Sequence, residues 1–365
     1  MPANAQRYLV DAVQLHDLQQ RDLSVCPKAP HVIANSADAT RFSAIAQPLG
    51  APACEVHHQG EYLAAAEKIT IAEDAACMLR LALMFGTLLW IPVCLLLLLL
   101  SFPAMQATAI FACGIGLLMI VQPKGAHWPP ARGPPALRRR FYRYFSLKLV
   151  MPGPEAFVPG RQYIFAGAPH GVFPLGDLLS CLLAPLGHIH GLAAPAALRV
   201  PFYGDLLRWA GMVECGKKNV MRLMHENGRS VGVMPGGIAE IFHNSRDAEA
   251  SVMLERKGFV KLALQTGSIL VPCYTLGNSQ LMSCLTRPEL AWLSRVLRMS
   301  CTIFWGRGGL PIPHRTPLCF LMGQPIELNP SEPGVPVPNP TNQQVQQLLT
   351  AVSREKNHHL DFRRR

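Results

Sequence analysis

The longest apolar stretch of the chain, residues 81 to 121, contains no Asp, Glu, Lys, Arg or His. A helix of about 40 residues would extend roughly 60 Å, about twice the thickness of the hydrocarbon core of a bilayer. Pro103, near the middle of this stretch, lacks the backbone donor that a continuing helix needs. The pattern therefore predicts a membrane hairpin at 79–123, with transmembrane spans at 81–100 and 104–121 joined by a tight turn.

Positively charged residues gather directly after this hairpin. They are Lys124, Arg132, Arg138, Arg139, Arg140 and Arg143. Positive flanks tend to stay on the cytosolic side of a membrane, and a hairpin returns the chain to the side from which it started. We therefore expect both soluble regions to face the cytosol. A re-entrant hairpin that enters the bilayer without crossing it predicts the same sidedness, and the sequence leaves the two arrangements open.

Downstream of residue 124, short apolar runs alternate with helical patterns. Strands are expected at 163–165, 231–234 and 269–274. Helices are expected at 175–183, from Pro201, at 217–227 and at 259–266, the last two each followed by a terminating glycine. This alternation of strand and helix predicts an α/β domain at 124–328 with a mostly parallel sheet.

The two ends of the chain follow different patterns. Residues 1–78 lack sustained periodicity, so we expect a mostly disordered cytosolic region. Cys54, His57 and His58 resemble metal ligands, but a solvated polar stretch accounts for them. Residues 329–365 form a Pro-rich linker and then a helix with one apolar face, which we expect to dock on the domain. That face comprises Val345, Leu348, Leu349 and Val352.

Composition and charge narrow the class of protein. Hydrophobic residues make up 50% of the chain and charged residues only 16%, a balance unusual for a soluble enzyme. The net charge of +11 suits anionic lipid or a polyanionic cofactor; no zinc-finger spacing or RNP-like strand is present, so nucleic-acid binding is not expected. The 11 cysteines include no Cys-x-x-Cys pair and are expected to be reduced. No apolar run follows Met1, so we expect membrane entry through the internal segment.

A histidine lies in the turn after the first predicted strand, within Ala168-Pro169-His170-Gly171. The α/β proteins display reactive groups at this position. Pro169 stiffens the turn, and Gly171 lets a substrate approach the imidazole. A neutral histidine can accept a proton from a hydroxyl group. Taken alone, the pattern suits a structural histidine as well as a catalytic base.

A glycine pair follows the predicted strand at 231–234. Gly236 and Gly237 can direct backbone N–H groups into a site, and Glu240 could orient or charge-stabilise His170. A tight turn with a surface glutamate would give the same residues, and the sequence leaves this open.

Three cations lie at the start of the helix predicted at 259–266. They are Arg256, Lys257 and Lys261. The positive end of a helix dipole adds to their charge, which favours a phosphate or pyrophosphate ligand. A solvated charged face is the alternative explanation.

Other motif-like segments are weaker. Gly228-Arg229-Ser230-Val231-Gly232 has the spacing of a lipase nucleophile elbow, but Ser230 would open a strand rather than follow one. Residues 211–218 approach a phosphate-binding loop, yet Lys218 replaces the hydroxyl residue that would hold magnesium. His188 and His190 lack further ligands at metal-binding spacing.

Together these segments resemble the type-2 diacylglycerol acyltransferases, including their monoacylglycerol and wax-ester branches. The similarity covers residues 138–328 and is closer to plant and algal members than to animal ones. The matching segments are 143–145, 163–165, 169–171, 201–202, 235–237 with Glu240, 256–261, 270–272, 304–306 through Pro311, and 323–326.

The resemblance implies a glycerolipid-acyltransferase-like α/β domain. It implies that His170 is the catalytic base and Glu240 its acidic partner. The first histidine of the family motif is Ala168 here, which leaves the shape of the acceptor pocket open. Asp177 is not at the His-x4-Asp spacing of the related glycerophosphate acyltransferases, so we expect a polar or capping residue, with a proton relay as the alternative. The expected oxyanion and substrate loop comprises Pro169, Gly171, Gly236 and Gly237; the expected CoA-binding residues are Arg256, Lys257 and Lys261.

The function expected from the resemblance is transfer of a fatty acyl group from acyl-CoA to diacylglycerol, giving triacylglycerol. Acyl-CoA is a co-substrate, and no metal or resident cofactor is expected. The same chemistry on monoacylglycerol, a long-chain alcohol or phytol is left open, as are a Ser230-dependent lipid hydrolase and an inactive membrane scaffold. The expected partners are acyl-CoA, membrane diacylglycerol and the lipid bilayer, with self-association open. The expected location is the endoplasmic reticulum membrane, with lipid-droplet association and plastid open.

Overall fold

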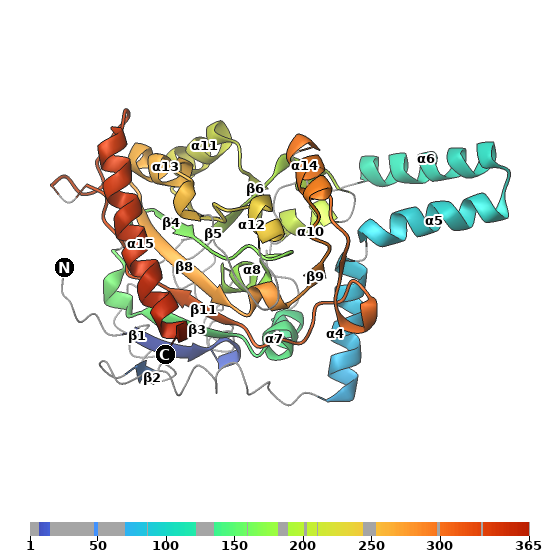
Figure 1. Ribbon diagram of the computed structural model, residues 1–365, viewed down its shortest axis with the longest axis horizontal. Helices are drawn as coiled ribbons and strands as arrows, with labels where there is room; N and C mark the ends of the chain where they lie inside the picture. The colour runs from blue at the N-terminus through green and yellow to red at the C-terminus, as the bar shows by residue number, and fades with distance from the viewer. Residues whose placement is uncertain are drawn as a thin grey trace.

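The computed structural model describes residues 7–14, 47–49, 70–85, 87–121, 135–158, 160–181, 189–200, 203–209, 211–243, 253–297, 300–329 and 331–364. Within these residues, nine strands form one sheet in the order β2-β1-β3-β11-β8-β4-β7-β5-β6 (Figure 1). Their bounds are β1 Arg7–Asp11, β2 Gln47–Leu49, β3 Lys148–Pro152, β4 Tyr163–Ala166, β5 Ile189–Ala193, β6 Val213–Glu214, β7 Ser230–Val233, β8 Ile269–Leu276 and β11 Cys319–Met322. The short strands β9 (Ser283–Cys284) and β10 (Phe304–Trp305) pair separately.

Parallel pairing dominates the described sheet. β4 pairs in parallel with both β7 and β8, β5 pairs in parallel with β6 and β7, and β3 pairs in parallel with β11. Antiparallel pairing joins β1 to β2 and β3, and β11 to β8. The prediction of an α/β domain with a mostly parallel sheet is confirmed.

Helices cover both faces of this sheet. In β4, Tyr163 belongs to one buried cluster and Ile164 to the other, since neighbouring side chains of a strand point to opposite faces. The first cluster also contains residues of α4 (Ile71–Phe85), α7 (Pro135–Tyr144) and α8 (Leu175–Cys181). The second contains residues of α11 (Lys217–Asn227), α13 (Gly258–Thr266) and α15 (Asn342–Arg364). The remaining α-helices of the domain are α9 (Pro195–Arg199), α10 (Tyr203–Trp209), α12 (Ile238–His243) and α14 (Pro288–Leu297).

Local sequence signals place several of these helices correctly. α11 ends at Gly228 and α13 at Gly267, both with the left-handed backbone that glycine adopts without strain. Val345, Leu349 and Val352 of α15 are buried against the second cluster, so the predicted docking of the C-terminal helix is confirmed.

The N-terminal region contributes to the sheet, which the sequence analysis did not predict. β1 pairs with β3 over five residues, and β2 pairs with β1. The expectation of disorder is therefore wrong for these two strands. β1 pairs with a strand more than 130 positions away along the chain, so local periodicity carries no sign of that pairing. Cys54, His57 and His58 lie outside the described residues.

The apolar stretch also begins differently from the prediction. Leu81, expected at the start of a membrane span, belongs to α4 and is buried in the domain core. Two ion pairs join α4 to the domain, Glu73 to Arg143 at 2.7 Å and Asp74 to Arg307 at 2.8 Å. The predicted helix at 81–100 is therefore wrong at its start, because α4 is an amphipathic helix that packs on the domain.

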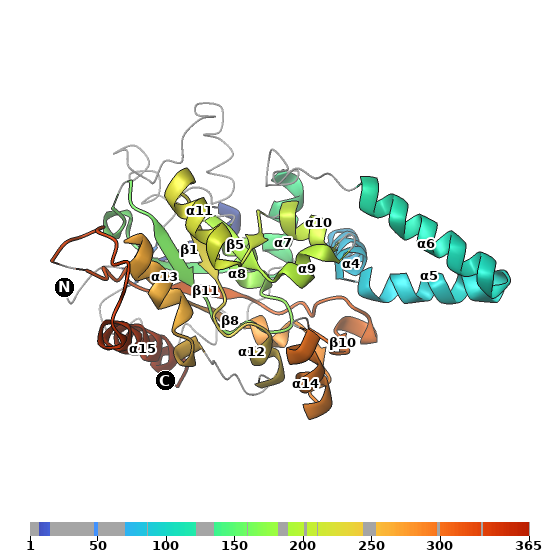
Figure 2. The same ribbon diagram turned by 90° about the horizontal axis from the view of Figure 1, so that it is seen from above.

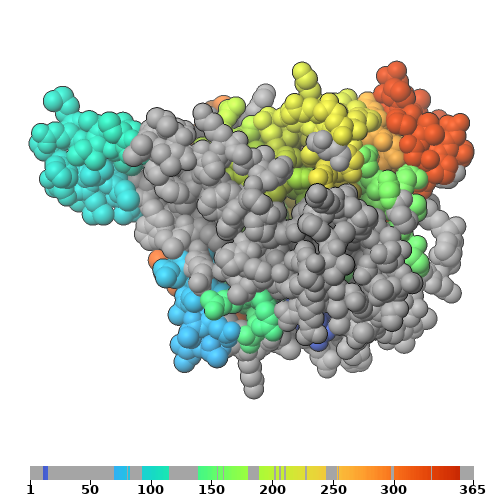
Figure 3. Space-filling model, turned by 180° about the vertical axis from the view of Figure 1, so that it is seen from behind, coloured from blue at the N-terminus to red at the C-terminus, as the bar shows by residue number. Residues whose placement is uncertain are grey.

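The hairpin consists of α5 (Thr87–Ser101) and α6 (Ala104–Val121), which break at Phe102 and Pro103 as predicted. It projects away from the sheet in Figure 1 and Figure 2, and it stands out from the body of the molecule in Figure 3. Of the helices in the described part of the chain, none combines the length and the apolar character that a membrane crossing requires.

Candidate active site

The loop after β4 holds His170 in a fixed backbone conformation. The Ala168–Pro169 peptide bond is cis. The Asn278 side-chain amide donates hydrogen bonds to the carbonyl oxygens of Pro169, at 2.8 Å, and His170, at 3.1 Å. Gly171 has a φ of +58°, and a Cβ there would lie 2.9 Å from the carbonyl oxygen of Asn278. The loop is therefore built around a close approach that only glycine allows.

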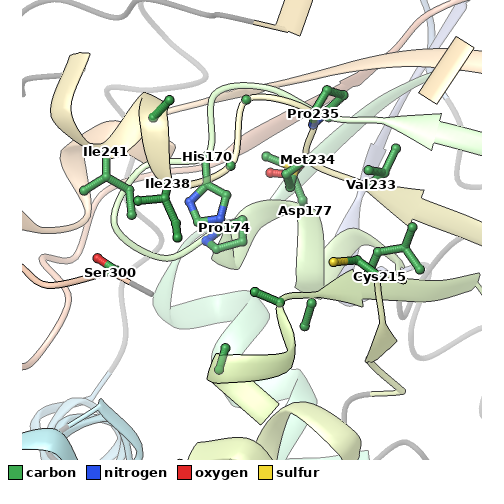
Figure 4. Close-up of a pocket in the computed structure, with 18 of the residues that line it drawn as sticks. His170, Pro174, Asp177, Cys215, Val233, Met234, Pro235, Ile238, Ile241 and Ser300 are labelled. Carbon is green, nitrogen blue, oxygen red and sulfur yellow. The ribbon is translucent and has the colours of Figure 1, made fainter. Parts of the chain in front are cut away.

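The imidazole of His170 has one nitrogen committed and one available. Nδ1 lies 2.8 Å from the carbonyl oxygen of Gly171. A carbonyl can only accept, so Nδ1 carries the proton and Nε2 presents its lone pair. Burial lowers the pKa of His170 below its usual value, which favours the neutral ring near pH 7. The ring points into a cavity (Figure 4), so a neutral base faces whatever the cavity binds.

Glu240, on α12, contacts the backbone of His170. Its carboxyl group is fully buried, and Oε2 accepts a hydrogen bond from the His170 amide at 2.7 Å. A Cβ at Gly236 would overlap the Glu240 carboxyl group, so that glycine makes room for it. The structure brings together the two residues that the sequence analysis paired. Their contact runs through the peptide and not through the ring.

The two glycines that follow β7 differ in the use of their backbone N–H groups. Gly237 donates its N–H to the carbonyl oxygen of Met234 at 3.1 Å, so that donor is used within the turn. The N–H of Gly236 makes no hydrogen bond with the described residues, and Gly236 lines the cavity. Both glycines were predicted to donate a backbone hydrogen bond to an oxyanion. Of the two, only Gly236 has an N–H that the described residues leave available.

Asp177, in the first turn of α8, is a second buried carboxyl group beside the cavity. It is 7% exposed, and neither oxygen makes a hydrogen bond with the described residues. Its pKa is raised to about 7, mainly by burial and to a smaller extent by the charge of Glu240, while the nearby Thr275 hydroxyl acts in the opposite direction. The expected capping role is not seen.

The cavity has a volume of about 1530 Å³ and is lined mainly by apolar side chains. His170 and the glycine pair line it together with the three predicted phosphate-binding cations, Arg256, Lys257 and Lys261. All three cations are exposed. The structure thus places the candidate base and the candidate anion site on one cavity large enough for a lipid substrate.

Several residues of the site were missed by the sequence analysis. Asn278 follows the carboxyl end of β8, a strand parallel to β4, so the rule that site residues follow such strand ends could have found it. Lys217, Arg295 of α14 and Arg287, which directly precedes α14, add positive charge to the cavity lining. No motif connects Lys217 to the two arginines, which lie far from it along the chain.

Ser230 is remote from this constellation. It opens β7, whereas His170 follows the carboxyl end of the adjacent parallel strand. Its hydroxyl accepts a hydrogen bond from the backbone N–H of Tyr163 at 3.1 Å and is buried. This position differs from that of an exposed nucleophile at a strand-to-helix turn.

The chain is similar in sequence to a known protein family and to several acyltransferases. The family described as diacylglycerol acyltransferase matches residues 132–360. The 2-acylglycerol O-acyltransferase 1 of Bos taurus is 29% identical over 238 residues, or 58% of this chain and 68% of the relative. The diacylglycerol O-acyltransferase 2-like protein 6 of Bos taurus is 29% identical over 216 residues (52% and 63%), and the diacylglycerol O-acyltransferase 2 of Dictyostelium discoideum is 27% identical over 216 residues (53% and 64%).

The chain spans somewhat less than two thirds of the length of the last two relatives. No solved structure is significantly similar to it. The predicted likeness to plant and algal members stays a prediction.

Proposed function

The chain belongs to the diacylglycerol acyltransferase family, and from this premise we propose that it transfers a fatty acyl group from acyl-CoA to the hydroxyl group of diacylglycerol, giving triacylglycerol. One observation carries the proposal: Nε2 of His170, which makes no hydrogen bond with the described residues, faces a largely apolar cavity that cations also line. Lipid acceptor and charged acyl donor can therefore meet at one base.

The reaction needs a base, an oxyanion donor and a leaving group. Nε2 of His170 takes the proton of the acceptor hydroxyl as its oxygen attacks the thioester carbon. The N–H of Gly236 donates to the oxyanion of the tetrahedral intermediate. The intermediate collapses by breaking its C–S bond, and His170 returns the proton to the departing CoA thiolate. Bonds and protons balance without a further reactant.

The part of the cavity that Arg256, Lys257 and Lys261 line is proposed to bind the phosphates of CoA. Arg256 and Lys257 directly precede α13, and Lys261 lies in its first turn. The unpaired N–H groups at the start of a helix and the positive end of its dipole favour a phosphate there.

The α5–α6 hairpin is proposed to meet a lipid bilayer, with the catalytic domain on the cytosolic face of the endoplasmic reticulum. Large apolar side chains of the hairpin are exposed. They include Leu96, Leu97, Leu100, Met105 and Ile110. Burying such surface in lipid is favourable, and the acceptor is itself a membrane lipid.

The test is an assay in membranes of a host that makes no triacylglycerol of its own. Label from acyl-CoA should enter triacylglycerol, and His170→Ala should reduce this by about 100-fold or more, because general-base catalysis contributes that much. His225→Ala, which removes an exposed histidine of α11, serves as the control and should keep full activity. Full activity of His170→Ala would overturn the mechanism, and release of labelled fatty acid in place of triacylglycerol, abolished by Ser230→Ala, would favour a hydrolase.

An acceptor panel tests the finer assignment. Monoacylglycerol is the second candidate, because a relative of this chain is named a 2-acylglycerol O-acyltransferase. Long-chain alcohol and phytol complete the panel. Label found only in wax or phytyl esters would overturn the diacylglycerol assignment and leave the reaction class in place.

A further inference from the structure

Asp177 is the buried polar group of the cavity that the proposed mechanism leaves unused. It lies beside the ends of two strands. Gly167 directly follows β4 and Met234 directly follows β7, and a Cβ at Gly167 would overlap both an Asp177 oxygen and the sulfur of Met234. Figure 4 shows Asp177 beside Met234 and Pro235, in the same cavity as His170. The carboxyl group therefore lies on the wall of the cavity that His170 also lines.

The fold does not satisfy this carboxyl group. It is 7% exposed, and neither oxygen has a hydrogen-bond partner among the described residues. The Thr275 hydroxyl, also buried and without a partner, can donate to one oxygen at most. Buried polar groups are almost always hydrogen-bonded, and an apolar residue would destabilise this position less. A partner that arrives with the substrate explains why a carboxyl group stands here.

Asp177 does not serve as a relay to the base. The Nδ1 atom, which a relay carboxylate would contact, is already bonded to the carbonyl oxygen of Gly171. Glu240, the other buried carboxyl group, holds the His170 amide. The remaining target for Asp177 is the ligand in the cavity.

The chemistry around Asp177 selects the class of that ligand. The cavity that Asp177 lines is mostly apolar, with Leu178, Ile189, Leu192 and Val233 among its lining residues, which suits the carbon chains of a lipid. Burial raises the pKa of Asp177 to about 7, so both the protonated and the ionised forms are populated near neutral pH. In the protonated form it donates to an ester carbonyl, and in either form it accepts from a hydroxyl group.

We propose that Asp177 is a specificity-determining residue that hydrogen-bonds a second polar group of the acyl acceptor, so that acylglycerols are preferred over alcohols with a single hydroxyl group. The inference rests on the proposed acyltransferase function and deepens it. A glycerolipid acceptor carries an ester carbonyl or a further hydroxyl beside the reacting one. A long-chain alcohol or phytol has nothing to offer Asp177, so binding it leaves the carboxyl group buried and unpaired.

The test compares two acceptors in the full chain. Wild type, Asp177→Leu and Asp177→Asn are assayed with dihexanoylglycerol and with 1-dodecanol. For Asp177→Leu, we expect the ratio of kcat/KM for dihexanoylglycerol to that for dodecanol to fall by about 10-fold or more, mainly through KM, since the lost bond is made in binding. Asp177→Asn keeps a neutral donor and acceptor and should keep the ratio within about 3-fold of wild type. An unchanged ratio in Asp177→Leu overturns the inference.

A matched control separates specificity from general damage to the cavity. Leu178→Ala, at the next position of the same helix, removes an apolar lining residue and should affect both acceptors to the same extent. The Tm of Asp177→Leu should equal or exceed that of wild type, because an unsatisfied buried carboxyl group is removed. A lower Tm together with equal loss on both acceptors would assign Asp177 to the fold and overturn the inference.

Failure of the proposed function gives a different result. If wild type transfers acyl groups to no acceptor, the function is overturned, and binding decides the inference separately. Dihexanoylglycerol should then raise the Tm of wild type more than that of Asp177→Leu. Equal shifts in the two proteins would overturn the acylglycerol site as well.

Discussion

Glu240 and Asp177 lie on helices that follow neighbouring parallel strands, and both carboxyl groups are buried. Glu240 accepts the backbone N–H of His170 at 2.7 Å. Asp177 makes no hydrogen bond with the described residues. The α12 region thus uses its carboxyl group to hold the loop, whereas the α8 region leaves its own for the cavity. Burial of a carboxyl group is therefore no guide to its role until its partner is known.

Replacing Gly236 by Ala should have the largest effect on this contrast. The added Cβ would overlap the Glu240 carboxyl group and displace it from the His170 amide. A displacement of about 1 Å at a catalytic group lowers activity by about 100-fold, so we expect a fall of that order in kcat/KM. Gly216→Ala is the control, since its Cβ would meet other atoms only at 3.6 Å and beyond. Wild-type activity of Gly236→Ala would show that Glu240 does not set the position of His170.

Replacing Glu240 by Gln should have a moderate effect. Gln can still accept the His170 N–H, so we expect a loss of less than about 10-fold in kcat/KM. Burial holds the pKa of His170 below its usual value of 6.5, so activity should fall with decreasing pH only below about 6.5, where the base becomes protonated. Because Glu240 does not touch the ring, this acid limb should not move in Glu240→Gln. A downward shift of the acid limb by about one pH unit would show that Glu240 interacts with the imidazole of His170. Glu240 would then not act through the backbone alone.

The smallest effect concerns stability and its dependence on pH. The pKa of Asp177 is raised from 3.8 to about 7 in the folded protein. Between these values the folded state binds more protons than the unfolded state, so the contribution of Asp177 to stability is complete below about pH 4 and is lost as pH rises through about 7. Asp177→Leu lacks this titration. The difference between its Tm and that of wild type should therefore increase from pH 4.5 to pH 7.5. A difference that stays constant over this range would contradict the raised pKa.

The parts of the fold that depend on local sequence were predicted well. Residues 217–227 and 259–266 carry a helical pattern and end at glycines with left-handed backbone, so their ends are set within a few residues. β1 could not be found in this way. Its place at the sheet edge depends on pairing with β3, more than 130 residues away, and a strand of five residues leaves little pattern in a polar region.

The candidate site was predicted in its members but not in its contacts. His170 and Gly236 follow the carboxyl ends of β4 and β7, and parallel strands bring such ends together. Whether Glu240 reaches the ring or the peptide of His170 depends on the exact path of two loops, which residue types do not specify. That Asp177 has no hydrogen-bond partner among the described residues likewise becomes clear only from the folded structure.

The availability of Nε2 in His170 has a consequence for the order of events. No acidic side chain of the described residues bonds to its ring, so the basicity of His170 depends on how much water surrounds it. Acyl chains that fill the cavity remove water from the imidazole and hold it in the neutral form. In the proposed mechanism, the acceptor lipid would therefore do more than bring the hydroxyl group, because its arrival would also desolvate the imidazole that deprotonates it.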